Sequence, residues 1–181
     1  MADEQPNPGA NGAASNGNGA ATGSEPQVAT LAQYIKDLSV ESPSAPQVFQ
    51  WQEQPALDVN FQLNVERAGE DMHEVALKTE VKAQSSNGVH FLVDLSYAGL
   101  YALRNFPEEA MGAFLLVEAP RLLFPFARQI VAEAVQNSGF PPLLLEPIDF
   151  AAAYMAQMQA QQGQQGAVPG AAPSGDEPGE A

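Results

Sequence analysis

The chain has 181 residues, of which 22 are acidic and 7 basic, so its formal charge at pH 7 is −15. Nucleic acids and anionic membranes are bound through lysine and arginine, so this balance argues against both and favours a basic partner. No cysteine is present, which excludes disulfides, thiol catalysis and cysteine-based zinc sites. The N-terminus lacks the features of a signal peptide, and the longest apolar run, 113–117, is far shorter than the ~20 residues of a membrane span. We therefore expect a soluble cytoplasmic protein without direct membrane insertion.

The two ends of the chain are predicted to be acidic, disordered tails, covering residues 1–27 and 161–181. Both consist mainly of small and polar residues, which cannot bury enough apolar surface to offset the entropy of ordering. Residues 28–160 form the predicted folded domain. The tails carry only six of the acids, so the remaining sixteen face all seven bases and the folded part is acidic as well.

The first predicted strand lies in the stretch 31–51 and ends at Glu41, where Pro43 and Pro46 prevent its continuation. Side chains on a strand alternate between two faces, although Lys36 interrupts the apolar pattern here. The alternation predicts Tyr34, Leu38 and Val40 on one face and Ile35, Asp37, Ser39 and Glu41 on the other. Asp37 and Glu41 would then lie about 13 Å apart on one face, at ~3.3 Å per residue.

Three further strands follow. Segment 57–65 alternates five times, with Leu57, Val59, Phe61, Leu63 and Val65 on one face. Segment 74–82 alternates in the same way, and Asn87-Gly88 predicts a tight hairpin of type I′ into a fourth strand over 89–97. Short links between four alternating segments predict an antiparallel sheet with one apolar face.

Helices are expected in the second half of the chain. The first begins near Pro107 and reaches Pro120, where it should break, kink or restart, and a second runs to about residue 137 with a kink near Pro125. Segment 140–149 contains three prolines and is predicted to be an apolar, non-helical connection. A last helix covers 150–161. The fold class is therefore α+β, with helices covering the apolar face of the sheet.

The residues show no catalytic or metal-binding pattern, and we predict no enzyme, metal or cofactor. His73 and His90 lie on different strands and are interpreted as solvated or sheet-edge residues, while no phosphate loop or nucleophile elbow is present. The unusual feature is apolar surface: three leucines, 143–145, stand in a proline-rich connection. Tyr154 and Met158 on the last helix either close the core or line an adjustable apolar groove.

Four blocks carry a resemblance to the bacterial protein-export chaperone SecB family: YIKDLSVESPSAPQVFQ, HFLVDLSYAG, PRLLFPFARQ and FPPLLLEPIDFAAAYM. They stand in the family's order and span roughly residues 31–160. The resemblance implies a four-stranded antiparallel sheet with helices on one face, assembled as a homotetramer that is a dimer of dimers. It also implies binding of unfolded preproteins and their transfer to the motor ATPase SecA, without ATP hydrolysis by this chain.

The resemblance further assigns site residues. The family's SecA contacts fall on Asp37, Glu41, Leu92 and Asp94, where Asp94 replaces the usual glutamate. Its contacts between dimers fall on Val93, Leu95 and Tyr97. The client groove falls on Leu57, Val59, Phe61, Tyr154 and Met158.

Two alternative functions remain. A chaperone of the same fold could serve another client, such as a toxin–antitoxin pair, although the acids at Asp37, Glu41 and Asp94 would then be dispensable. A small-molecule-binding or hydrolytic α+β domain would need a closed pocket with convergent polar groups, and the sequence gives no sign of one.

Overall fold

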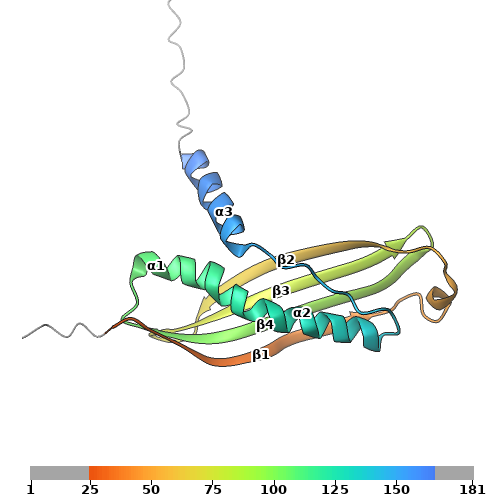
Figure 1. Ribbon diagram of the computed structural model, residues 1–181, viewed down its shortest axis with the longest axis horizontal. Helices are drawn as coiled ribbons and strands as arrows, with labels where there is room; N and C mark the ends of the chain where they lie inside the picture. Colours follow the sequence, from red (N-terminus) through yellow and green to blue (C-terminus); the bar gives the residue numbers. More distant parts are fainter. Residues whose placement is uncertain (1–24, 166–181) are drawn as a thin grey trace, which may run out of the picture.

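The computed structural model describes residues 25–165, with side chains described up to residue 160. Four strands form one antiparallel sheet in the order β1-β4-β3-β2. Their bounds are β1 (Gln27–Glu41), β2 (Ala56–Arg67), β3 (Met72–Ser85) and β4 (Gly88–Arg104). The predicted four-stranded antiparallel sheet is confirmed, and Figure 1 shows helices lying over one of its faces. The predicted tails fall almost entirely on residues 1–24 and 166–181, outside the described residues.

The two central strands, β3 and β4, supply most of the core. In β3 the predicted alternation holds, because Val75, Leu77 and Val81 are buried while Lys78 between them is half-exposed. Strand β4 is longer than predicted and continues from residue 97 to Arg104. Val75, Leu77 and their neighbours pack beneath the helices, which gives the sheet an inner face under the helices and an outer face on the opposite side.

The predicted faces of β1 are wrong in its first half, because the strand contains irregularities. The register against β4 shifts between Thr30 and Ala32 and again between Ile35 and Asp37. Ile35 pairs with Tyr97 of the inner face, whereas Asp37 pairs with Ser96 of the outer face. A bulge inserts one extra residue and reverses the alternation beyond it. Ile35 therefore shares the inner face with Leu38 and Val40, and Tyr34 shares the outer face with Asp37.

The inner face of the sheet is covered by one continuous helical run made of α1 (Glu108–Ala113), η2 (Phe114–Glu118) and α2 (Ala119–Asn137). The five residues of η2 form a π-helical turn that ends at Glu118, two residues before Pro120. Proline lacks the N–H that would continue the helical ladder, and a π turn at this point accommodates that loss without ending the helix. The predicted break at Pro120 is thus a local change of helix type, and Pro125 lies inside α2.

By length and composition the run Glu108–Asn137 would also pass as a membrane-spanning helix. Several of its apolar residues nevertheless lie against the sheet, with Leu123, Val131 and Val135 fully buried, whereas Leu122 and Phe126 are exposed. The apolar character of this helix is explained by the core that it completes, as in the buried helix of a globular domain. The longest uninterrupted apolar run, 113–117, gave no sign of so long an apolar helix, because the apolar residues are spread over its whole length.

Gly99 in β4 allows α2 to approach the sheet closely. A Cβ atom at this position would lie 2.7 Å from the Tyr101 hydroxyl and 2.9 Å from Cδ2 of Leu123, both of them fully buried residues. Glycine is required here for space, because only a residue without a side chain fits beneath the helix. The fourth strand was predicted to end at residue 97, whereas Gly99 lies inside β4.

Two irregular segments connect the strands and helices. The excursion 42–55 between β1 and β2 contains the short helix η1 (Gln47–Gln50), and the connection 140–149 has no helix or strand, as predicted. Helix α3 (Phe150–Gln165) follows; its first turn is capped by Asp149, whose Oδ1 accepts a 2.9 Å hydrogen bond from Ala152 N. In Figure 1 α3 projects away from the sheet. It continues four residues past the predicted end at 161.

Candidate functional site

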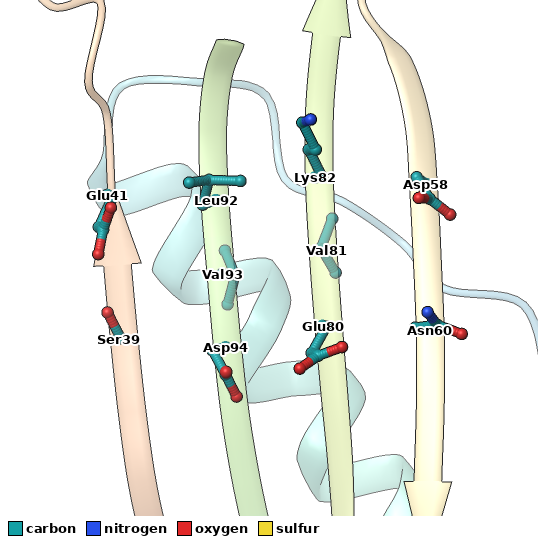
Figure 2. A pocket seen from close by; sticks show the side chains of 10 residues that line it. All are labelled: Ser39, Glu41, Asp58, Asn60, Glu80, Val81, Lys82, Leu92, Val93 and Asp94. Carbon is teal, nitrogen blue, oxygen red and sulfur yellow. The ribbon is translucent and has the colours of Figure 1, made fainter.

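The outer face of the sheet carries a hollow of about 420 Å³ that crosses all four strands. The strand register places its polar side chains in two rows, because each residue pairs with a neighbour on the adjacent strand. One row contains Glu41, Leu92, Lys82 and Asp58, and the next contains Ser39, Asp94, Glu80 and Asn60. Figure 2 shows these eight side chains on one side of the strands, with Val81 and Val93 on the other. We call this surface the acidic hollow.

The four residues that the resemblance assigns to SecA all belong to this face. Glu41 pairs with Leu92, and Asp37 pairs with Ser96, one row beyond Asp94. The predicted meeting of the two strand faces on one surface is therefore confirmed, while the identity of the partner stays a prediction. The sequence did not single out Asp58 and Glu80, the acids that β2 and β3 add to the hollow. Alternation placed both on polar faces, but only strand order brings those faces beside β4.

Lys78 is the cation that forms ion pairs with two acids of the hollow. Its Nζ lies 2.6 Å from Glu80 Oε1 and 3.2 Å from Asp94 Oδ2, and the three side chains are 39–40% exposed. Glu80 first and Asp94 second raise the pKa of Lys78, because both carboxylates stabilise the charged ammonium. The other Asp94 oxygen, Oδ1, is buried without a hydrogen-bond partner among the described residues. One oxygen of Asp94 is thus neutralised internally and the other is unsatisfied.

A second polar cluster fixes the bulged part of β1 beside the hollow. Glu74 of β3 accepts hydrogen bonds from both the Tyr34 hydroxyl and the Lys36 ammonium. Lys36 first and Tyr34 second hold the pKa of Glu74 below its usual range, while the hydrogen bond to Glu74 raises the pKa of Tyr34 and of Lys36. This cluster ties the bulge to the neighbouring part of the sheet. The cluster therefore helps to keep the Asp37 side chain on the outer face of the sheet.

Two hollows with apolar walls lie away from the acidic one, along β2 and the irregular segments. The first, of about 520 Å³, lies between the excursion 42–55 and the start of the connection 140–149. Gly139 takes a positive φ of 88° at the end of α2 and turns the chain toward this hollow. The ring centroid of Phe140 then lies 5.4 Å from that of Phe49 and 5.0 Å from that of Phe91. The hollow also contains Leu57, which is 49% exposed.

The second apolar hollow, of about 350 Å³, lies between β2 and the start of α3. Phe61 and Tyr154 line it together, so the structure brings these two residues of β2 and α3 to one hollow, while their role in client binding stays a prediction. Val59 lies between the hollows and packs half-buried against the core. Met158 is 39% exposed and lines neither of these two hollows. Of the five residues assigned to the client groove, Leu57 lines the first hollow, Phe61 and Tyr154 line the second, and Val59 and Met158 line neither.

The interpretation of His90 as a solvated or sheet-edge residue is wrong. Only 5% of His90 is exposed, and it lies in the first apolar hollow with its ring centroid 5.0 Å from that of Trp51. Its Nε2 is 2.9 Å from the Ser85 hydroxyl. The register between β3 and β4 shifts between Ala83 and Gln84, so His90 lies at an irregularity that plain alternation does not anticipate.

Val93, Leu95 and Tyr97, assigned to the contact between dimers, are all at least nine-tenths buried within the single chain. They lie on the inner face beneath the helices, and the Tyr97 ring stacks on that of Phe126 of α2 at 6.2 Å. Phe126 is itself 49% exposed. These three residues therefore do not form a free surface of the described chain, and Phe126 is the exposed residue that stacks on one of them.

Exposed apolar side chains gather on the inner side of β1 and on α2. The edge strand β1 is scarcely covered by the helix, so its apolar residues remain exposed, and α2 adds two more from its outer side. The group consists of Ile35, Leu38, Val40, Leu122 and Phe126. We call this group the apolar ridge. Exposed apolar groups of this kind mark surfaces that bind other protein chains.

These features first define a class: an α+β domain with open surface hollows, suited to binding other polypeptides rather than to enclosing a small molecule. The family model described as preprotein translocase subunit SecB matches residues 21–161. The protein-export protein SecB of Rhizorhabdus wittichii is 56% identical over 136 residues, which cover 75% of this chain and 82% of that protein. The SecB of Zymomonas mobilis is 52% identical over 146 residues, 81% of this chain and 89% of that protein. The chain belongs to the SecB family.

A solved structure has the same fold. The Mycobacterium tuberculosis Rv1957 SecB-like chaperone, in complex with a ChAD peptide from the HigA1 antitoxin, superposes with a TM-score of 0.55. Its sequence is 19% identical, and the match covers 67% of this chain and 90% of that one. At this identity the likeness supports the sheet-and-helix architecture alone.

Proposed function

We propose that this chain is an ATP-independent chaperone of the bacterial cytoplasm that holds unfolded preproteins in an export-competent state and delivers them to SecA. The observation that carries the proposal is the separation of two kinds of surface on one sheet. The acidic hollow occupies the outer face, while the apolar hollows lie along β2 and the irregular segments. Membership of the SecB family supports the same function.

Client segments would bind the two apolar hollows along β2. In this proposal Leu57 contributes to the first hollow and Phe61 with Tyr154 to the second, while Val59 forms the floor between them and Met158 extends the surface along α3. Burying apolar side chains gains about 25 cal/mol per Å², so several hundred Å² yields several kcal/mol before ordering costs are subtracted. Aromatic walls suit this role, because they accept many different apolar side chains without directional bonds.

SecA would dock on the acidic hollow through a basic segment, with Asp37, Glu41 and Asp94 as charged contacts and Leu92 as an apolar contact among them. Five carboxylates lie on this part of the outer face, those of Asp37, Glu41, Asp58, Glu80 and Asp94, against two lysines. Such a surface attracts basic partners over a distance set by the salt concentration, about 8 Å at physiological ionic strength.

The assembly would be a homotetramer built as a dimer of dimers, in which the apolar ridge is covered by other copies of the chain. Because Val93, Leu95 and Tyr97 lie beneath α2, we propose that they act on the contact between dimers by supporting the helix, with Phe126 as the residue that makes the contact. Several copies of the apolar hollows would then engage one long client at once, which raises the overall affinity without new types of contact.

The separation of surfaces can be tested by charge reversal. The variant with Asp37→Lys and Glu41→Lys should lose SecA binding in a titration and keep its suppression of client aggregation. The matched control carries Asp71→Lys, an acid outside the acidic hollow. Loss of both activities in the reversed variant, or the same loss in the control, would contradict the proposal.

A further inference from the structure

Lys78 occupies the position that a cationic side chain of a docking partner would need. Its ammonium lies between Glu80 and Asp94, at 2.6 Å and 3.2 Å from their nearest oxygens, and both of these acids line the acidic hollow. The second oxygen of Asp94 has no hydrogen-bond partner among the described residues. The place between these two carboxylates is therefore already filled by a cation of the chain itself.

We propose that Lys78 is an internal counter-ion, which a cationic side chain of the docking partner displaces from Glu80 and Asp94 and which thereby limits the affinity of docking. This inference rests on the proposed docking of SecA on the acidic hollow and adds the regulation of that same surface. The partner's lysine or arginine replaces Lys78 between the two carboxylates, and the released Lys78 ammonium turns to solvent.

The exchange is feasible because the ion pairs of Lys78 are exposed. The side chains of Lys78, Glu80 and Asp94 are 39–40% accessible, so water already competes for all three groups. Exposed ion pairs contribute little free energy, and a long lysine side chain reaches other positions at small cost. Docking therefore substitutes one ion pair for another, and its affinity is a difference between two similar interactions.

The same arrangement gives selectivity. A partner with a single cation gains little by replacing Lys78, because the carboxylates lose one ion pair as they form another. A partner with several cations also reaches Asp37, Glu41 and Asp58, which form no ion pair within 4 Å among the described residues. Lys78 thus favours a multiply charged segment over an isolated lysine or arginine.

Lys82 offers a matched control. It lies on the same strand and the same face, four residues further along, and it lines the acidic hollow. Among the described residues it forms no ion pair within 4 Å. Replacing either lysine by glutamine makes the face more negative by one charge. Only the replacement of Lys78 also removes a cation that the partner must displace.

The experiment measures SecA binding calorimetrically, at low salt, to the full-length chain and to its Lys78→Gln, Lys82→Gln and Lys78→Arg variants. We expect Lys78→Gln to bind about 1.5- to 5-fold more tightly than Lys82→Gln, the range that exposed ion pairs produce. Lys78→Arg should bind like the unaltered chain, because the internal cation remains. Circular dichroism and light scattering verify that fold and mass are unchanged.

A double-mutant cycle adds a second readout. Glu80→Gln should weaken SecA binding in the Lys78→Gln background more than in the unaltered chain, where Glu80 is already paired. Equal affinities for Lys78→Gln and Lys82→Gln, or weaker binding by Lys78→Gln, would overturn the counter-ion role and leave the docking proposal intact. Absence of SecA binding by the unaltered chain would instead refute the docking proposal, and the counter-ion role with it.

Discussion

Replacing Gly99 by alanine tests whether close contact between sheet and helix holds the fold together. The added Cβ would lie 2.7 Å from the Tyr101 hydroxyl, 2.8 Å from its Cε2 and 2.9 Å from Cδ2 of Leu123. None of these neighbours has free space to move into, because Tyr101 and Leu123 are fully buried. Overpacking of this kind costs about 1–3 kcal/mol.

The opposing contribution of the same substitution is smaller. Alanine restricts the unfolded chain more than glycine, and by itself this would stabilise the strand by about 0.5–1 kcal/mol. Overpacking outweighs this gain, and the free energy of unfolding falls by about 1–2 kcal/mol. For a chain of this size each kcal/mol corresponds to about 2–4 °C in the midpoint of thermal unfolding.

The assay is thermal and urea unfolding of the Gly99→Ala variant beside a Gly112→Ala control. Gly112 lies in α1, where an added Cβ meets only the Tyr154 hydroxyl at 3.3 Å and where alanine favours the helix by up to about 1 kcal/mol. We expect the two substitutions to change stability in opposite directions. Stabilisation by Gly99→Ala would show that α2 does not approach β4 as described, and would remove the physical basis for the buried position of Tyr97.

Three further predictions concern the polar cluster on β1, the apolar ridge and the client hollows. Glu74→Gln should lower stability at pH 7 and have little effect at a pH below the folded pKa of Glu74, because that pKa is lowered, so the stabilisation is complete above the unfolded pKa, about 4.3, and is lost only as pH falls through the folded value. Urea unfolding at both pH values checks this, and an equal loss at both would contradict it. Phe126→Asp should reduce the proposed tetramer to a smaller species by light scattering, while Gln136→Asp, an exposed control on the same helix, should leave the mass unchanged. An unaltered mass for Phe126→Asp would argue against the ridge as an interface. Leu57→Ser and Tyr154→Ser, one in each hollow, should each weaken client binding by up to about tenfold, which corresponds to about 1.4 kcal/mol of binding free energy. The control Gln62→Ser on the outer face should leave client binding unchanged. Equal effects of all three substitutions would refute the assignment of the hollows.

The strands were predictable where one face alone is buried and the pairing is regular. Segment 57–65 and β3 alternate without interruption, and the burial in the structure follows this alternation except at Leu57, which is exposed, and at Ala76, which is buried. The alternation failed at Ile35–Asp37 and beside His90, since a bulge adds one residue without changing composition. A register shift cannot be predicted from the pattern of one strand, because it depends on how that strand pairs with its neighbour.

The acidic hollow could be predicted only in part for a related reason. Asp37 and Glu41 were recognisable as a pair on one strand face, and the resemblance added Leu92 and Asp94. Asp58 and Glu80 required the order β1-β4-β3-β2, because two strands separate Glu41 from Asp58 across the sheet. The ion pair between Lys78 and Asp94 could not be predicted either, since Asp94 lies sixteen residues further along the chain.

The aromatic contacts around Phe140 determine how the first apolar hollow can open. Phe140 meets Phe49 from one irregular segment and Phe91 from the sheet, while no ladder of backbone hydrogen bonds joins the excursion 42–55 to the connection 140–149. Local openings that break few backbone hydrogen bonds require little free energy. The hollow can therefore widen for bulky client segments while the sheet keeps its register. Opening of this kind would leave the arrangement of the carboxylates on the outer face of the sheet unchanged.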